Sequence, residues 1–228
     1  MSNKSIGENT GAEPPARAYR SELRQRQAAE TRLRIVAAAA DLFATTGYAR
    51  TTLASIGAAA GVSTETVQAQ GAKAALMIAA VEFTAFGHTE EQNILDLDIG
   101  QRFLALTDRD EAIDLIVDEQ TSIHERTAAI SRALFGAAAT DPQLDQYLTG
   151  LLASIGRQIR RLLEVCAQHG WLRDDVGFDE LVETAVVISS TETYLRMVHH
   201  DGWNIDDYRA WFHRVLAEAV FGSTPSSR

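Results

Sequence analysis

The chain has 228 residues, with 21 basic and 31 acidic side chains, so its formal net charge is −10 at pH 7. A hydrophobic content of 46% is typical of a globular chain, and one cysteine excludes both an internal disulfide framework and a cysteine-rich zinc site. No apolar run approaches the roughly 18 residues that a membrane span requires, and the polar start does not resemble a secretory signal. Composition therefore predicts a soluble cytoplasmic protein of one or two domains, without a membrane partner.

The charge is distributed unevenly along the chain. Residues 1–82 carry nine basic and seven acidic side chains, whereas residues 83–228 carry 12 basic and 24 acidic ones. Such asymmetry is expected when one part of a chain contacts nucleic acid, although a solvated basic helix face gives the same count. The charge alone leaves both interpretations open.

The spacing of apolar residues predicts an all-α fold with an N-terminal helix-turn-helix domain over residues 26–87. Helices are expected at residues 26–46, 53–60, 64–70 and 72–86, with glycines or hydroxyl caps at their ends. Short helices are marginal alone, so they must share a small core. The residues with the spacing to form that core are Leu42, Phe43, Leu53, Ile56, Val62 and Val67.

Residues 1–25 are expected to form a flexible basic arm, because they are polar and include Pro14 and Pro15. The arm carries Arg17, Arg20 and Arg24. Basic arms of this kind enter the minor groove of DNA in some proteins and have no such role in others, so both possibilities remain open.

Residues 88–228 are expected to form a helical bundle for effector binding and dimerisation. Asp108 before an acidic first turn, and Asp141 followed by Pro142, are start signals for two long helices. Further helices are expected at residues 99–106, 178–199 and 204–221. The bundle has more apolar surface than a monomer needs.

The order of residues in the N-terminal domain resembles the tetracycline-repressor-like (TetR) family of bacterial transcription regulators. The resemblance covers roughly 50 residues. It implies a DNA-reading domain, a variable helical ligand domain and a homodimer built on the last two helices. The matching residues are Arg34-Ile35, Ala38-Ala39, Leu42-Phe43, Gly47, Thr51-Thr52, Ile56, Ala60-Gly61-Val62-Ser63, Thr66-Val67, Lys73 and Leu76; similar C-terminal stretches are Thr191 to Leu195, Gly202-Trp203 and Tyr208 to Trp211.

Glutamine and hydroxyl side chains on the second short helix suit reading of the major groove, because glutamine can bond both N6 and N7 of adenine. Family members usually carry an aromatic residue at the place of Gln68 and another near Gly71, so the chain departs from the pattern twice. The expected DNA-binding residues are Arg50, Thr51, Thr52, Ser63, Thr64, Glu65, Thr66, Gln68, Ala69, Gln70 and Lys73.

The bundle offers candidates for effector binding and for dimerisation. The expected effector-binding residues are Phe103, His124, Leu151, Ile155 and Tyr194, and the expected dimer interface contains Tyr194, Met197, Val198, Trp203, Trp211 and Val215. His199-His200-Asp201 is interpreted as the charged end of a helix, since adjacent histidines on a helix point in different directions. No metal and no cofactor are expected.

The sequence predicts a sequence-specific, ligand-responsive transcriptional regulator that binds a palindromic operator in double-stranded DNA. Repression relieved by a small apolar or amphipathic effector is the leading hypothesis. The alternative is a helical ligand-binding or interaction protein whose DNA-reading domain has decayed, motivated by the missing aromatic residues. An enzyme is not expected, because the chain shows no nucleophile–base pair, no HExxH motif and no phosphate-binding loop.

Overall fold

The computed structural model describes residues 16–86 and 93–222. Within those ranges the regular secondary structure is helical, and β pairing is limited to one isolated antiparallel bridge between Leu172 and Phe221. The all-α prediction is therefore confirmed. The elements are α1 (Ala16–Thr46), α2 (Leu53–Ala60), α3 (Thr64–Gln68), α4 (Lys73–Phe86), the 3-10 turn η1 (Ile94–Asp96), α5 (Asp98–Leu104), α6 (Arg109–Ala138), α7 (Pro142–Gln168), α8 (Phe178–Ile188), α9 (Thr191–Tyr194), the π-helix η2 (Leu195–His200) and α10 (Ile205–Ala219).

Helices α1 to α4, which we call the reading head, form where the local signals place them. Gly47 and Gly61 adopt positive φ angles of 86° and 67° just after α1 and α2, a conformation that glycine adopts without strain. Thr52 and Ser55 form a reciprocal capping box at the start of α2, and Ser63 accepts a hydrogen bond from the amide of Thr66 at the start of α3. These caps confirm the predicted boundaries of the two short helices to within about two residues.

The predicted core of the reading head is confirmed. Phe43, Ile56 and Val67 are completely buried, one from each of the first three helices. Leu42, Leu53 and Val62 pack against them and are partly buried. This shared core holds two helices that are too short to be stable alone.

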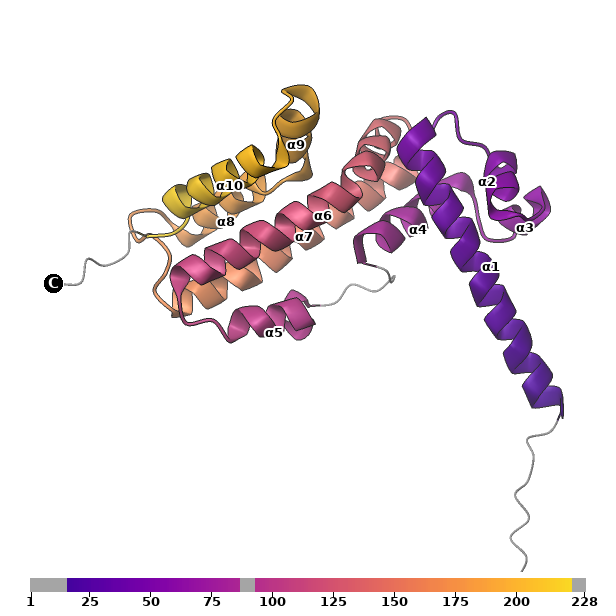
Figure 1. Ribbon diagram of the computed structural model, residues 1–228, viewed down its shortest axis with the longest axis horizontal. Helices are drawn as coiled ribbons and strands as arrows, with labels where there is room; N and C mark the ends of the chain where they lie inside the picture. The colour runs from indigo at the N-terminus through magenta and orange to yellow at the C-terminus, as the bar shows by residue number, and fades with distance from the viewer. Residues whose placement is uncertain (1–15, 87–92, 223–228) are drawn as a thin grey trace, which may run out of the picture.

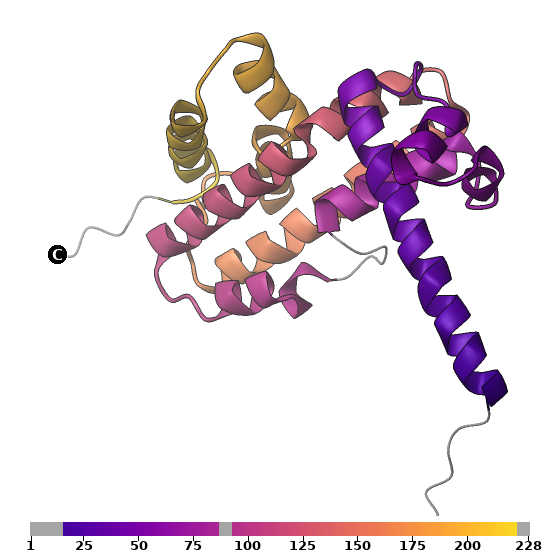
Figure 2. The same ribbon diagram turned by 45° about the vertical axis from the view of Figure 1, so that its right-hand side comes forward.

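The start of α1 corrects one prediction. The helix begins at Ala16, so residues 16–25 are helical where a flexible arm was expected. Residues 1–15 of that expected arm lie outside the described part. In Figures 1 and 2, the N-terminal half of α1 projects away from the rest of the molecule.

The bundle is built around two long helices, α6 and α7, which lie side by side (Figure 1). The carboxylate of Asp108 accepts hydrogen bonds from the amides of Asp110 and Glu111, and Asp141 caps α7 with Pro142 in its first turn. Both predicted start signals are confirmed. Helices α8 and α10 contact each other, and α10 also packs on α6.

The prediction of one long helix at residues 178–199 is wrong. Helix α8 ends at Ile188, because the hydroxyl groups of Ser189 and Thr193 donate to the carbonyls of Ala185 and Val187. Ser190 then caps the short α9, which continues into the π-helix η2. Hydroxyl side chains compete for backbone groups in this way, and here they break the helix.

Helix α6 belongs to both halves of the molecule. Its C-terminal residues Ile130 and Leu134, together with Leu144 of α7, are buried in the same core as the reading head. Its N-terminal residues Ile113 and Val117 are buried in the core of the bundle. Helix α6 therefore packs directly into both cores.

None of the helices in the described part of the chain is long and apolar enough to cross a membrane.

Candidate nucleic-acid interface and the bundle sites

The short helix α3 presents a polar surface to solvent. Glu65, Gln68 and Ala69 are exposed, whereas Val67 on the opposite side is completely buried. The buried valine holds the helix against the head, so the polar face has one orientation. Among the predicted DNA-binding residues, Gln68 has the long, exposed amide that base recognition requires.

Hydroxyl groups at the start of α3 are occupied by local hydrogen bonds. The hydroxyl of Ser63 accepts from the amide of Thr66 at 3.2 Å, and the two hydroxyl oxygens lie 3.1 Å apart. The Glu65 backbone amide and the Ser63 hydroxyl keep the pKa of the Glu65 carboxyl below its usual value. Glu65 is thus ionised at neutral pH and is suited to accept from a base amino group rather than to approach a phosphate.

Gln70 is tied to helix α1. Its Oε1 accepts a hydrogen bond from Nη1 of Arg32 at 3.2 Å, across 38 residues of sequence. Sequence reasoning predicted Gln70 as a DNA contact and overlooked Arg32, whose partner is recognisable only once α1 and α3 are placed together. Gln70 therefore positions the end of the recognition segment in this structure.

Thr51 requires a correction. Its side chain is 1% exposed, and its hydroxyl donates to the carbonyl of Gly47 at 2.8 Å. The threonine thus stabilises the turn between α1 and α2 and does not face solvent. Its neighbours Arg50 and Thr52 are exposed at the same turn, where Nε of Arg50 donates to the carbonyl of Thr46.

Lys73 is also engaged within the protein. Its Nζ donates to the carbonyl of Thr51 at 2.9 Å and lies 4.3 Å from the centre of the Tyr48 ring. Tyr48 in turn donates to Oδ2 of Asp141 at 2.9 Å. Burial and this hydrogen bond raise the pKa of Tyr48 to about 12. Lys73 was predicted to contact phosphate, but here it joins the start of α4 to the turn that holds Thr51.

Tyr48 connects the core of the head with Lys73 and with α7. Tyr48 packs on Phe43, with ring centroids 5.7 Å apart, and supports Lys73 on its other side. The signal that could have identified Tyr48 is its place directly after the glycine that ends α1. The Tyr48–Asp141 hydrogen bond connects the head to α7 beside a hollow of about 440 Å³ between the end of α1 and α6.

A polar cluster lies in the bundle around His124 of α6. The Gln120 amide donates to Nε2 of His124 at 2.9 Å and to the carbonyl of Ser189 at 3.3 Å, while Nδ1 lies 3.3 Å from the hydroxyl of Tyr208. The imidazole is 1% exposed, and burial lowers its pKa to about 4, while a hydrogen bond with the Ser189 backbone acts in the opposite direction. His124 is therefore neutral near pH 7 and joins α6, α10 and the break after α8.

The predicted effector-binding residues are only partly brought together. His124 and Tyr194 are neighbours, with ring centroids 5.1 Å apart, and Phe103 is buried in the same core. Leu151, in contrast, packs against the core of the head, and Ile155 is 38% exposed. Sequence reasoning overlooked Gln120, Tyr208 and Thr121.

The hydroxyl of Thr121 is buried on α6 and has no hydrogen-bond partner among the described residues. Thr121 and His124 are three residues apart on one helix and share a face. Thr121 therefore adds a second buried polar group to the face of α6 that carries His124.

The predicted dimer residues fall into two groups. Trp203 is 40% exposed, and Trp211, Met197, Val198 and Val215 are half-buried. Tyr194 is 4% exposed and packs edge-on against Tyr208, so its side chain lies in the interior of this structure.

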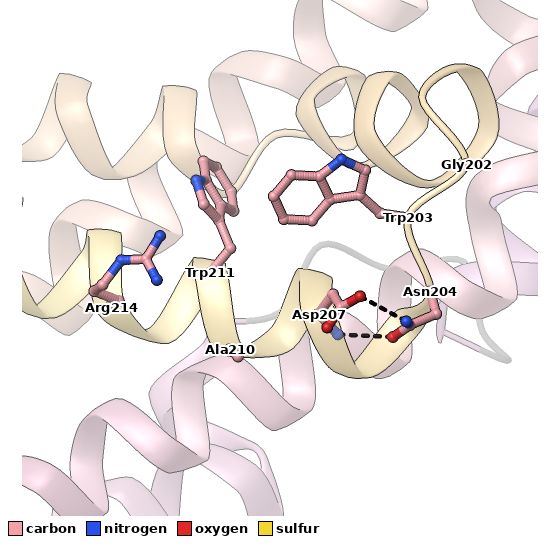
Figure 3. A pocket seen from close by; sticks show the side chains of 7 residues that line it. All are labelled: Gly202, Trp203, Asn204, Asp207, Ala210, Trp211 and Arg214. Carbon is pink, nitrogen blue, oxygen red and sulfur yellow. Dashed lines mark hydrogen bonds between the residues drawn. The ribbon is translucent and has the colours of Figure 1, made fainter.

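Figure 3 shows the indoles of Trp203 and Trp211 side by side, with Arg214 beyond Trp211. They line a shallow hollow of about 540 Å³ along α10, in which Asn204 donates to Asp207. Val187 of α8, which the sequence did not single out, is 64% exposed.

Residues 35–70, which span the second part of α1, α2, α3 and the residues just after it, match the family model described as bacterial regulatory proteins, tetR family. The likeness to this family therefore rests on the reading head. A search of curated proteins by sequence found no match.

Solved structures share the fold of this chain at low sequence identity. A complex of SmeT with triclosan aligns with a TM-score of 0.63 and 18% identity over 87% of this chain and 96% of that one. The fatty acid degradation regulator FadR from Bacillus halodurans aligns with a TM-score of 0.62 and 17% identity over 81% and 93%. The TetR family transcriptional regulator PfmR from Thermus thermophilus aligns with 0.59 and 17% over 81% and 97%.

Proposed function

We propose that the chain is a homodimeric repressor, which binds a palindromic operator and is released from it by a small apolar or amphipathic effector. The observation that carries the proposal is the exposed polar face of α3, held rigidly by buried Val67 on a head whose core continues into α6. In this proposal residues 26–87 read DNA, and residues 88–228 bind the effector and the partner subunit.

The proposed DNA contacts combine base recognition with positioning. Gln68 and Glu65 contact base edges, and Thr64, Thr66 and Ala69 line the same short helix. Exposed Arg50 and Thr52, with Ser63, contact phosphates at the helix starts. Gln70 and Lys73 act mainly by holding the recognition segment in place.

The proposed effector site lies at the polar cluster on α6. His124, Thr121 and Tyr194 supply polar groups next to the apolar core that contains Phe103. The solved structures fit a ligand of this class, since one contains triclosan and another regulates fatty acid degradation. A ligand that separates α6 from α10 moves the end of α6 that is packed in the reading head.

The proposed dimer forms through α8 and α10. Large apolar side chains remain exposed on or beside these helices, with Val187 at 64% and Trp203 at 40%. The neighbouring indoles of Trp203 and Trp211 (Figure 3) supply the aromatic residues in which interfaces are enriched. A two-fold dimer also provides the paired heads that a palindromic operator requires.

The test is selection of genomic DNA fragments by the purified chain at physiological salt, followed by sequencing. Enrichment of a palindromic site supports a dimeric sequence-specific regulator. Retention that is blind to sequence, or no retention, supports the second candidate, a ligand-binding protein of this fold whose reading head has decayed. That candidate is favoured by one observation, the exposed Gln68 in place of an aromatic residue.

A further inference from the structure

We infer that the projecting N-terminal half of α1 is a helical DNA arm, which contacts the phosphates of the duplex beside the half-site read by α3. The inference rests on the proposed DNA-binding function and extends it to a second contact surface on each subunit. We call residues 16–34 the basic arm.

The first observation in favour of this proposal is the position of the basic arm. Side chains from Arg24 to Glu30 are all exposed, and the first buried residue of α1 among the described side chains is Ile35. Both ribbon views show this half of α1 extending beyond α2 and α3 (Figures 1 and 2). The described side chains from Arg24 to Glu30 add no buried surface to the head, so packing does not explain this length of helix, and a binding surface does.

The second observation is the net charge of the basic arm, which is opposite in sign to that of the other residues. Residues 16–34 contain six arginines and two glutamates, a net charge of +4. The other residues of the chain contain 15 basic and 29 acidic side chains, a net charge of −14. Basic residues concentrated on one helix of an acidic protein are the electrostatic footprint of a nucleic-acid contact.

The junction between the arm and α3 identifies DNA as the partner. Arg32 donates to Gln70, which lies two residues after the end of the recognition helix. When α3 lies in the major groove, residues preceding Arg32 are therefore held next to the adjoining backbone. Residues 16–31 span about 24 Å at 1.5 Å per residue, equivalent to about 7 base pairs of duplex.

The test compares a double variant of the arm, Arg24→Ala with Arg26→Ala, with a control double variant in the bundle, Arg102→Ala with Arg126→Ala. All four arginines are exposed, and both variants remove two positive charges. The probe is the duplex selected from genomic DNA, used at full length and with 7 base pairs trimmed from each flank. Dissociation constants are measured from 50 to 200 mM salt.

We expect the arm variant to lower the slope of log affinity against log salt by about 1.8, or 0.9 per lost phosphate contact. Between 50 and 200 mM salt, its affinity deficit relative to wild type then shrinks by about 12-fold. Trimming the flanks weakens binding of the wild type and of the control variant more than binding of the arm variant, which keeps Arg17 and Arg20 but has lost two of its phosphate contacts. Lysine at positions 24 and 26 restores the slope, because it restores the charge.

The proposal is wrong if the salt slope of the arm variant equals that of wild type. It is also wrong if trimming the duplex costs both proteins the same affinity. Equal slopes for the two double variants also overturn it, because they show a response to net charge alone. If the wild-type chain binds no duplex at all, the proposed regulatory function fails first. Failure of the arm proposal gives a different result. In that case the wild type binds the operator, and the arm variant has the same salt slope and the same loss on trimming as the wild type.

Discussion

Protonation of His124 is expected to destabilise the folded protein in mildly acidic solution. The imidazole is 1% exposed, Gln120 donates to its Nε2, and burial lowers its pKa to about 4. In the unfolded chain the pKa of histidine is about 6.5. A lowered pKa favours the neutral form in the folded state, so this contribution to stability is present above pH 6.5 and is lost as the pH falls toward 4.

The difference between the two pKa values sets the magnitude. A gap of about 2.5 pH units corresponds to roughly 3 kcal/mol below pH 4, at 1.36 kcal/mol per unit. At pH 5 the unfolded histidine is almost fully protonated and the folded one mostly neutral, so the loss relative to pH 7.5 is about 2 kcal/mol. A charged imidazole also presents Nε2–H to the Gln120 amide, which then loses its acceptor.

The assay is urea unfolding of the wild type and of His124→Gln at pH 7.5 and pH 5.0, at one protein concentration because dimerisation affects stability. Glutamine does not titrate, so the variant is expected to lose about 2 kcal/mol less than wild type over this pH interval. His200→Gln, at an exposed position, serves as the control and should behave as wild type. Equal pH dependence in wild type and His124→Gln refutes the reasoning, because it shows that His124 is not a buried neutral group.

Three further substitutions separate recognition, local structure and assembly. Gln68→Ala should weaken operator binding by about 1–3 kcal/mol in a titration, whereas Gln146→Ala, also exposed but on α7, should not. Lys73→Ala should lower the free energy of unfolding by about 1–2 kcal/mol and reduce the salt slope of DNA binding by less than one, since its Nζ is bound to Thr51. Trp203→Ala should shift sedimentation toward the monomer with little change in helical content; an unchanged dimer contradicts the proposed interface.

Local signals account for the parts of the fold that could be predicted. Asp108, Asp141 and Ser63 cap helices through hydrogen bonds to amides two or three residues away. Gly47 and Gly61 adopt left-handed conformations at the ends of their helices. Caps and glycine conformations act within one turn of helix, so the order of residues alone locates them.

The roles of the site residues depend on partners that are distant in sequence. Arg32 and Gln70 are 38 residues apart, and Tyr48 and Asp141 are 93 apart. These contacts give Gln70 a positioning role and link the reading head to the bundle. Hydrogen bonds between residues so far apart in sequence follow no periodic pattern. The sequence therefore shows which residue types are present but does not show which residues pair.

The amino-acid sequence alone determines the all-α fold, the tetR-like reading head, its buried residues and most helix ends, because periodicity and capping are encoded within a few neighbouring residues. The tertiary structure alone decides that Thr51 and Tyr194 are interior, that α8 stops at Ile188, and that α6 joins the two cores. Burial of a side chain depends on the helix that packs over it. That helix is supplied by a distant part of the chain, through packing that no local pattern specifies.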